Sequence, residues 1–449
     1  MVLSIFCVET LTTSCFSSKI TLLVNELAKS GTTSMQQQIK SADRFLIRNI
    51  NQSVLLNLIR AHAPVSRPQL ATLSGLSQVT VIKITNNLID RQFILEKEYA
   101  ESTGGRRAGL LEINPEGGFA VGLMTQPDSL TAVILNLNSD PVYSQQWNIT
   151  LRDNSPQGID LLSRCVEQLI RESNVPREKI IGAGIGMSGL IDAERGYCID
   201  SWMLNWQNVE ISRPLEDRLG IPVFLDNDVN CLATYEKLFG QGQPYRHFLV
   251  VAIGQGVGLG IVINGDLYRG SFGGAGEFGH TAVITEGRLC ECGNHGCLET
   301  YLSNSGIVKN YLEYVLSNTY GLETGFQEPT IHEIVEQARN GDEAAKAAFQ
   351  RAGILLGVSL ANLVNIFNPE CIVLSGPDTD ASILADNLLL EPMHQAFKQH
   401  LFSQIGKDLY FVVERRGFES WARGAGSLVL RHFFASPAHV HSERTLVLS

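Results

Sequence analysis

Residues 273–299 read GGAGEFGHTAVITEGRLCECGNHGCLE, a glycine-rich stretch with three closely spaced cysteines. Four of its side chains suit a metal ion and lie within eighteen residues: the imidazole of His280 and the thiols of Cys290, Cys292 and Cys297. Three thiolates and one histidine complete a tetrahedral zinc shell without an open position, so such a site is structural. Glycines between the ligands allow the chain to wrap tightly around an ion. The sequence therefore predicts a structural Zn²⁺ site; three free thiols near a histidine are the plainer alternative.

The same stretch resembles the signature of the ROK family, which contains repressors, open reading frames and sugar kinases. The resemblance covers the chain from about residue 40 to its end. It implies an α/β fold of duplicated actin/hexokinase-like lobes. In the repressor branch an α+β winged helix-turn-helix domain with a GGRR-type wing precedes the lobes, and this chain carries GGRR at residues 104–107.

Strand patterns joined by glycines after Pro115 also indicate two lobes. Three consecutive strand patterns cover residues 119–125, 130–138 and 142–149, and a helix pattern follows at residues 158–172. A second strand meander covers residues 247–270. This repetition predicts a duplicated α/β architecture with a cleft between the lobes. We also expect residues 179–192 to form one buried strand and residues 344–367 to form a pair of helices.

These patterns divide the chain into four parts. We expect a poorly ordered extension, a DNA-binding module, a first lobe completed by the C-terminal helix, and a second lobe that carries the zinc loop. The boundaries are 1–40, 41–113, 114–235 (with about 420–449) and 236–419. Met35 is an alternative start, and the sequence leaves open whether residues 1–34 belong to the native protein.

Composition and charge indicate the class of protein. The 449 residues are 44% hydrophobic and 18% charged, which suits two or three folded domains. The sequence has no run of about 18 uncharged apolar residues, so we expect no membrane span. Nine mostly scattered cysteines without a secretory signal predict reduced thiols and a cytoplasmic location. Residues 41–110 carry nine Lys or Arg against five Asp or Glu in a chain of net charge −11, which favours a local polyanion-binding unit.

Residues 51–113 carry the pattern of a winged helix-turn-helix. Ser66 and Gln69 form the sequence of a capping box, the first short helix ends at Ser74-Gly75, and a second helix follows. The residues expected to contact DNA are Ser77, Gln78 and Lys83 on the second helix, and Arg106 and Arg107 in the wing. Glutamine and lysine can read base edges, while arginines at a glycine-rich tip can reach phosphates or the minor groove. A small helical bundle with a basic hairpin is the alternative.

The family resemblance also implies a set of sugar ligands. Matched position by position, they are Asn227, Asp228, Glu277, His280 and Glu299, with weaker support for Ser188, Asn205 and Trp206. Carboxylates that accept pairs of hydroxyl hydrogens are suited to sugar recognition. Since Glu277 and Glu299 flank the cysteine cluster, we expect the metal site to order the sugar site.

The phosphate-binding turns of the family's kinases are eroded in this chain. Residues 122–129 lack the expected glycines, and Pro127 removes a backbone donor. The second turn keeps its glycines but has Gln255 where the kinases have threonine. We therefore expect no ATP binding and a regulator in place of an enzyme; if the chain is a kinase instead, Asp228 is the catalytic base.

The leading interpretation is a sugar-responsive repressor of carbohydrate-metabolism genes. It implies a double-stranded DNA operator, a sugar or sugar phosphate inducer, and a homodimer or homotetramer that matches a two-fold symmetric operator. The alternatives are a ROK-type sugar kinase with an added regulatory domain and a repressor that is sequestered by a protein partner. The sequence leaves open the identity of the sugar, its phosphorylation, the operator and the oligomeric state.

Overall fold

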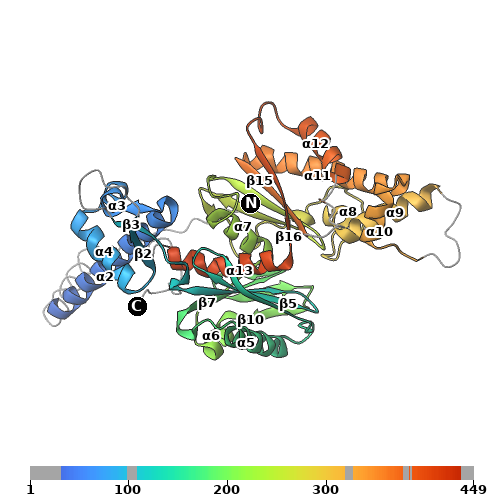
Figure 1. The fold of residues 1–449 in the computed structure, drawn as a ribbon. Coiled ribbons are helices and arrows are strands. Elements are labelled where there is room, and N and C mark those ends of the chain that lie inside the picture. The colour runs from blue at the N-terminus through green and yellow to red at the C-terminus, as the bar shows by residue number, and fades with distance from the viewer. Residues whose placement is uncertain (1–31, 99–108, 319–326, 378–383, 385–386, 436–449) are drawn as a thin grey trace, which may run out of the picture.

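The computed structural model describes residues 32–98, 109–318, 327–377, 384 and 387–435 (Figure 1). Within these ranges the chain forms an amino-terminal module and two larger lobes, each built on a five-stranded sheet. The duplicated α/β architecture predicted from the strand patterns is therefore present.

The amino-terminal module consists of three helices and a small antiparallel sheet of order β1-β3-β2. The elements are α2 (Thr32–His62), β1 (Val65–Ser66), α3 (Arg67–Ser74), α4 (Gln78–Asp90), β2 (Ile94–Glu98) and β3 (Gly109–Ile113). Ser66 and Gln69 make the predicted capping box, Gly75 ends α3 at φ +69°, and Ser77 caps α4. Two short helices and a following hairpin have the arrangement of a winged helix-turn-helix. Helix α2 begins nine residues before the predicted domain boundary at residue 41.

The sheet of the first lobe has the strand order β11-β7-β4-β5-β6. Its strands are β4 (Phe119–Thr125), β5 (Leu130–Asn136), β6 (Pro141–Trp147), β7 (Ile180–Met187) and β11 (Val223–Asn227). Helices α5 (Ser155–Glu172) and α6 (Ser212–Leu219) cover one face. Helix α13 (Phe418–Phe434), from the end of the chain, covers the other face beside α7 (Asp228–Leu238). Glycine is required beneath α13, since a Cβ on Gly184 would lie 1.9 Å from the Ala425 carbonyl oxygen.

A separate three-stranded sheet of order β10-β9-β8 adjoins this lobe. It consists of β8 (Leu190–Asp192), β9 (Tyr197–Ser201) and β10 (Trp206–Glu210). The prediction of one strand over residues 179–192 was wrong, because β7 and β8 belong to different sheets. The chain changes direction at Gly189, whose φ of +117° suits glycine and few other residues.

The second lobe repeats the plan with the strand order β14-β13-β12-β15-β16. Its strands are β12 (Phe248–Ile253), β13 (Val257–Ile263), β14 (Asp266–Leu267), β15 (Cys371–Pro377) and β16 (Tyr410–Arg416). Its helices are α8 (Glu299–Leu302), α9 (Asn304–Asn318), α10 (Ile331–Arg339), α11 (Glu343–Phe367) and α12 (Asn387–His400). Three short 3₁₀ turns complete the described chain: η1 (Pro115–Gly117), η2 (Arg177–Lys179) and η3 (Phe278–His280).

Helix α11 is a single helix of 25 residues, so the predicted pair of helices was wrong. Its internal glycines do not interrupt it; they allow close contact with α12. A Cβ on Gly357 would lie 2.3 Å from the carbonyl oxygen of Met393. Among the described residues, α11 is the one helix long and apolar enough to cross a membrane, and here most of it is buried inside the second lobe.

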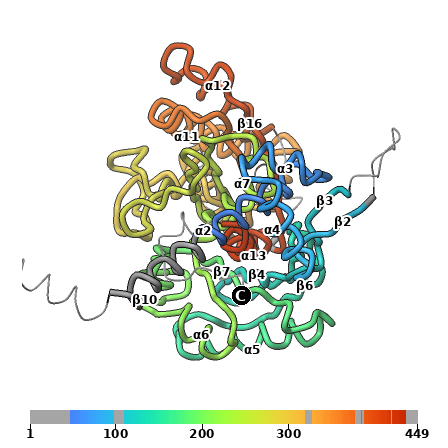
Figure 2. The backbone as a smooth tube through the Cα atoms, turned by 90° about the vertical axis from the view of Figure 1, so that its left-hand side faces the viewer, coloured from blue at the N-terminus to red at the C-terminus, as the bar shows by residue number. Residues whose placement is uncertain are grey.

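The amino-terminal module is docked on the first lobe through a shared hydrophobic core. Leu55, Leu56 and Ile59 of α2 belong to one buried cluster with residues of α13, including Phe433. The rings of Phe93 and Phe433 meet edge to face, with centroids 5.1 Å apart. Figure 2 looks from the side of this module, with α2 in front of α7 and α13. The module therefore packs directly on the helices of the first lobe.

Candidate functional site

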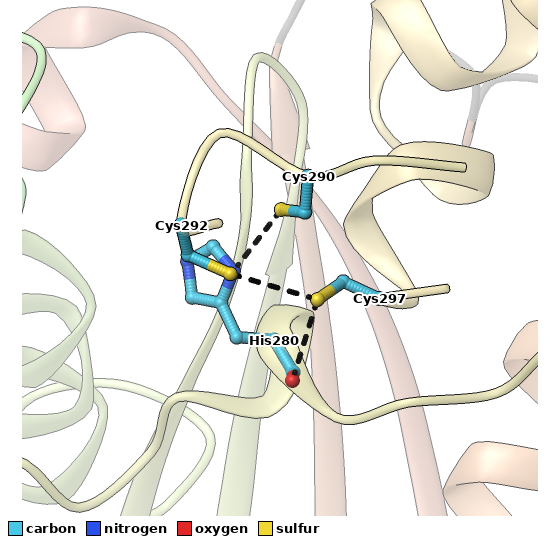
Figure 3. A group of neighbouring side chains, drawn as sticks. All are labelled: His280, Cys290, Cys292 and Cys297. Atoms are coloured by element: carbon cyan, nitrogen blue, oxygen red, sulfur yellow. Dashed lines mark hydrogen bonds between the residues drawn. The ribbon is translucent and has the colours of Figure 1, made fainter. Parts of the chain in front are cut away.

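Four potential metal ligands converge between the end of η3 and the start of α8 (Figure 3). The ligand atoms of His280, Cys290, Cys292 and Cys297 all lie within 4.8 Å of one another. The Sγ atoms of Cys292 and Cys297 are 3.7 Å apart, and Cys290 Sγ lies 3.6 Å from His280 Nδ1. A tetrahedral zinc ion with ordinary bond lengths requires about 3.8 Å between two sulfurs and about 3.6 Å between sulfur and nitrogen. The donor set and its spacing thus fit the ion that the sequence predicts.

The loop between these ligands is held by local backbone hydrogen bonds. Cys290 N–H donates to the Asn294 carbonyl and Gly293 N–H donates to the Cys290 carbonyl, closing a tight turn. Gly296 has φ +73°, and a Cβ there would lie 1.6 Å from the Ile284 carbonyl oxygen. This crowding explains why the tight wrap needs glycine at position 296.

A group of carboxylates surrounds the start of α7. Asn227 caps this helix through its side-chain oxygen, and Asp228 is its first residue. Burial raises the pKa of Asp228 to about 6, and the charges of Glu277 and Asp226 add to the shift. Burial also raises the pKa of Glu277, with a further contribution from Glu299. Repulsion among carboxylates favours a ligand that donates several hydrogen bonds to them.

His280 connects this carboxylate group to the cysteine cluster. Its Nδ1 faces Cys290, while its Nε2 lies 3.9 Å from Glu277 Oε2. A metal bound to Nδ1 leaves the proton on Nε2, where it can be donated to Glu277 or to a ligand. The two roles predicted for His280 therefore use different nitrogens and are compatible.

Sequence reasoning missed an ion pair directly beneath this group. Arg269 donates from Nε (2.8 Å) and Nη2 (2.6 Å) to Asp226 Oδ2, and the Asp226 side chain is only 1% exposed. The other oxygen of Asp226 accepts from Asn227 N and Asn230 Nδ2. Asp226 thus holds the first turn of α7 in position. The available signal was Asp226 itself, a carboxylate that directly follows the apolar residues 223–225.

The weaker sugar-ligand predictions lie in other surroundings. Ser188 Oγ lies 3.0 Å from Met203 Sδ, and Asn205 Nδ2 donates to Asp153 Oδ1 at 2.8 Å. Trp206 is 1% exposed and donates from Nε1 to the Leu151 carbonyl, so it is a core residue of the first lobe. The structure brings together the five stronger positions and does not place Trp206 where a ligand can contact it.

Two turns of this chain correspond to the phosphate-binding turns of the family's kinases, and several of their backbone groups already form hydrogen bonds within the chain. In the first turn, Gln126 N–H donates across the hairpin to Ser129 O, and Pro127 has no donor. In the second turn, Gly254 N–H donates to Gly256 O. Val257 N–H, in the same turn, donates to Glu299 Oε2 at 2.8 Å. These groups are therefore committed to contacts within the chain.

Helix α4 presents a polar and apolar surface to solvent. Ser77, Gln78 and Lys83 are exposed, as predicted. Val79 and Ile82 are also exposed, at 76% and 45%, although neither is polar. Val79 was missed because an apolar residue at helical spacing normally indicates core. Arg106 and Arg107, the predicted wing residues, lie outside the described residues.

An open hollow of about 610 Å³ is formed by α10, α11 and α12, with Arg339, Lys346 and Glu391 among its lining residues. It contains none of the predicted site residues.

Comparison with known proteins identifies the family. The family model described as "ROK family" matches residues 127–432, which is more than half of the chain. The chain belongs to the ROK family. It is 33% identical over 362 residues to a putative xylose repressor of Caldicellulosiruptor sp., covering 80% of this chain and 90% of the relative. It is 31% identical over 399 residues to the transcriptional dual regulator NagC of Escherichia coli, covering 88% of this chain and 95% of NagC.

Solved structures of the ROK family share the fold. A ROK transcriptional regulator described as a homologue of the E. coli MLC protein superimposes with a TM-score of 0.76 at 26% identity, covering 86% of this chain and 97% of that one. A Streptomyces griseus ROK glucokinase, solved with glucose and AMPPNP, gives 0.57 at 25% identity, covering 69% of this chain and 99% of the kinase. The predicted actin/hexokinase-like fold is thus confirmed for the two lobes, and the regulator matches a larger share of this ROK chain than the kinase does.

Proposed function

We propose that this ROK protein is a sugar-responsive transcriptional repressor of carbohydrate-metabolism genes. The proposal rests on the combination of two features in one chain: a helix-turn-helix module and a group of carboxylates suited to a sugar. In addition, backbone N–H groups of the phosphate-binding turns already donate hydrogen bonds within the chain. Relatives named as xylose repressor and N-acetylglucosamine repressor support the same function. DNA and a small sugar or sugar phosphate are the corresponding partners.

The proposed sugar ligands are Asn227, Asp228, Glu277, His280 and Glu299, with Ser188 and Asn205 as outer positions. Asp228, Glu277 and Glu299 accept hydrogen bonds from hydroxyl groups, and His280 donates from Nε2. Because these groups come from both lobes, a bound sugar favours one arrangement of the lobes over another. Only such differential binding can shift the equilibrium between two states of the repressor.

The proposed DNA contacts lie on α4 and in the wing. Gln78 and Lys83 read base edges, Ser77 contacts phosphate, and Arg106 and Arg107 reach the backbone or the minor groove. Val79 is exposed beside Gln78 and is suited to a thymine methyl group, the one apolar feature of the major groove. Two copies of the module in a homodimer or homotetramer match a two-fold symmetric operator.

A structural Zn²⁺ held by His280, Cys290, Cys292 and Cys297 completes the proposal. The ion orders the loop between Glu277 and Glu299 and takes no direct part in binding sugar. We place the protein in the cytoplasm, where reduced thiols, DNA and sugar metabolites are all available.

The test uses purified full-length protein and a DNA duplex that the protein selects from a random-sequence pool. D-xylose, N-acetyl-D-glucosamine and their phosphates are screened for binding by thermal shift, since a ligand that binds the folded state raises its apparent stability. We expect one of them to bind and to weaken the protein–DNA complex. Glu277→Ala should abolish the sugar response and retain DNA binding, whereas the nearby exposed Glu286→Ala should retain both. A normal sugar response in Glu277→Ala would contradict the site assignment.

A sugar kinase is the second candidate, because Asp228 keeps a raised pKa and the second turn keeps its glycines. A coupled ADP-release assay with Mg-ATP and the same sugars distinguishes the two functions. Turnover that disappears in Asp228→Asn would establish the kinase; we expect no turnover in either protein.

A further inference from the structure

One face of α2 places three polar side chains at the ends of two helices of the first lobe. Ser53, Asn57 and Arg60 are spaced by four and three residues, so they project from the same side of the helix. The contacts are Ser53 Oγ to Ala435 O (3.0 Å), Asn57 Nδ2 to Phe434 O (2.6 Å) and Arg60 Nη1 to Leu238 O (2.9 Å). Helix α13 ends at Phe434 and α7 ends at Leu238, so all three acceptors are terminal carbonyls.

Terminal carbonyls are the groups for which a helix has no internal partner. The last four carbonyls of a helix need outside donors, and together they carry the negative end of its dipole. Arg60 meets this requirement with a positive charge. Its guanidinium lies over the rings of Phe239 (5.7 Å) and Phe434 (5.1 Å), and its Nη2 also donates to Asn57 Oδ1. The cation is therefore enclosed between the two helix ends.

The opposite end of α7 is in the proposed sugar site. Asp228 is the first residue of this 11-residue helix, and Leu238 is the last. The helix is buried along most of its length and contacts α13 closely, because a Cβ on Gly424 would lie 3.1 Å from backbone atoms of Cys231. A helix of this length spans about 15 Å, so a tilt of about 10° at one end moves the other by about 2.6 Å. A hydrogen bond does not survive such a displacement.

We propose that Arg60, together with Asn57 and Ser53, forms the mechanical link between sugar occupancy and the position of the DNA-reading helices. In this role they are positioning residues: they touch neither sugar nor DNA, and they hold the module at the ends of α7 and α13. Helix α7 also packs on the second-lobe sheet, because a Cβ on Gly258 of β13 would lie 2.6 Å from the Val229 side chain. A sugar that binds Asp228 and Glu277 together changes the tilt of α7 between the two lobes and displaces the Leu238 carbonyl from Arg60. The module then loses its fixed orientation, and a two-fold operator is no longer matched by both copies. The inference rests on the proposed sugar-responsive function.

The experiment measures the coupling between the two sites in the full-length protein. The operator duplex is the one selected from a random pool, and the sugar is the D-xylose, N-acetyl-D-glucosamine or phosphate derivative that binds the wild type. Calorimetry gives sugar affinity, and fluorescence anisotropy gives operator affinity with and without saturating sugar. We expect sugar to weaken operator binding by the wild type by about 5- to 150-fold, the usual range of coupling between sites.

Arg60→Met keeps the apolar stem and removes the donors and the charge. We expect its operator affinity without sugar to fall toward that of the sugar-bound wild type, so that its coupling falls below about two-fold, while its sugar affinity in the absence of DNA is no weaker than that of the wild type. Arg60→Lys, which keeps the positive charge and an N–H donor group, should restore part of the coupling. Arg48→Met alters an exposed arginine on the same helix and should retain full coupling. If Arg60→Met does not fold, Asn57→Ala takes its place with the same expectation.

Full coupling in Arg60→Met or Asn57→Ala would overturn the inference. So would a loss of operator affinity that leaves the sugar-dependent ratio unchanged, because that result describes residues that only stabilise the module. A wild type that binds DNA without any response to sugar would instead refute the proposed function, and the inference would fall with it. The two failures are therefore distinguishable.

Discussion

Asp228 and Asp226 are separated by two positions in the chain, and their exchange for asparagine should have opposite effects on stability. Burial among like charges raises the pKa of Asp228 from 3.8 to about 6. The folded protein thus holds the Asp228 proton more tightly than the unfolded chain does. Ionisation of Asp228 therefore destabilises the fold, and the loss grows as pH rises from about 4 to about 6 and is complete above that.

A shift of roughly two units corresponds to at most about 3 kcal/mol at pH 8. Partial exposure of the side chain reduces this value, so we expect Asp228→Asn to stabilise the sugar-free protein by about 1–3 kcal/mol at pH 8. The gain should be about half as large at pH 5, since the folded wild type is then mostly protonated at this position. The apparent Tm should rise by about 2–4 °C for each kcal/mol.

Asp226→Asn is the matched comparison. It removes the partner of Arg269 and leaves a largely buried guanidinium unpaired, which costs about 3–5 kcal/mol. Thermal unfolding followed by intrinsic fluorescence at pH 5 and pH 8 measures both variants. If Asp228→Asn raised the free energy of unfolding equally at the two pH values, or did not raise it at pH 8, the argument that a buried negative charge at Asp228 destabilises the wild type would be refuted.

Three further results are expected. Cys292→Ser should lose the single bound zinc, measured by elemental analysis, and unfold at lower temperature, whereas His295→Ala should keep its metal, because His295 Nδ1 lies 3.0 Å from the Gly287 carbonyl oxygen and His295 is outside the four-ligand group. Zinc-depleted protein should bind its sugar about 10- to 100-fold more weakly by calorimetry, since the ion fixes the orientation of His280 toward Glu277. Replacing operator thymines one at a time with deoxyuridine should weaken binding about three- to four-fold at the position read by Val79, and Val79→Ala should remove that sensitivity; equal affinity at every position would exclude methyl recognition.

Features that depend on neighbours in the chain were predicted well from the sequence. Ser66 and Gln69 reach each other within one helical turn, so the capping box of α3 follows from their spacing alone. The cysteine cluster is similar, because its ligands lie within eighteen residues and a short loop can close around an ion. In both cases local geometry leaves few alternatives.

Features that depend on distant segments were predicted poorly. A pair of helices was expected over residues 344–367, whereas Gly353 and Gly357 lie inside one continuous helix and admit α12, because a glycine that weakens a helix and one that admits another helix are identical in the sequence. Trp206 was assigned to the sugar site, yet its environment is fixed by Gly158 and Leu151 from other elements. The ion-pair partner of Asp226 is Arg269, which lies 43 residues further along the chain. Such pairs become visible only when the lobes are assembled.

We expect Glu299 to connect the proposed sugar site to the second glycine turn. Its Oε2 accepts the N–H of Val257, so a donor in the second glycine turn is already satisfied within the chain. A nucleotide phosphate that used this N–H would have to displace the carboxylate, and the two negative charges would repel each other at short distance. A neutral sugar hydroxyl meets neither obstacle and can donate to the same carboxylate. In a kinase, binding energy is used to stabilise the transition state of phosphoryl transfer. In a protein that transfers no phosphate, the same binding energy changes only the balance between arrangements of the lobes, which is the property that the proposed sugar-responsive repressor requires.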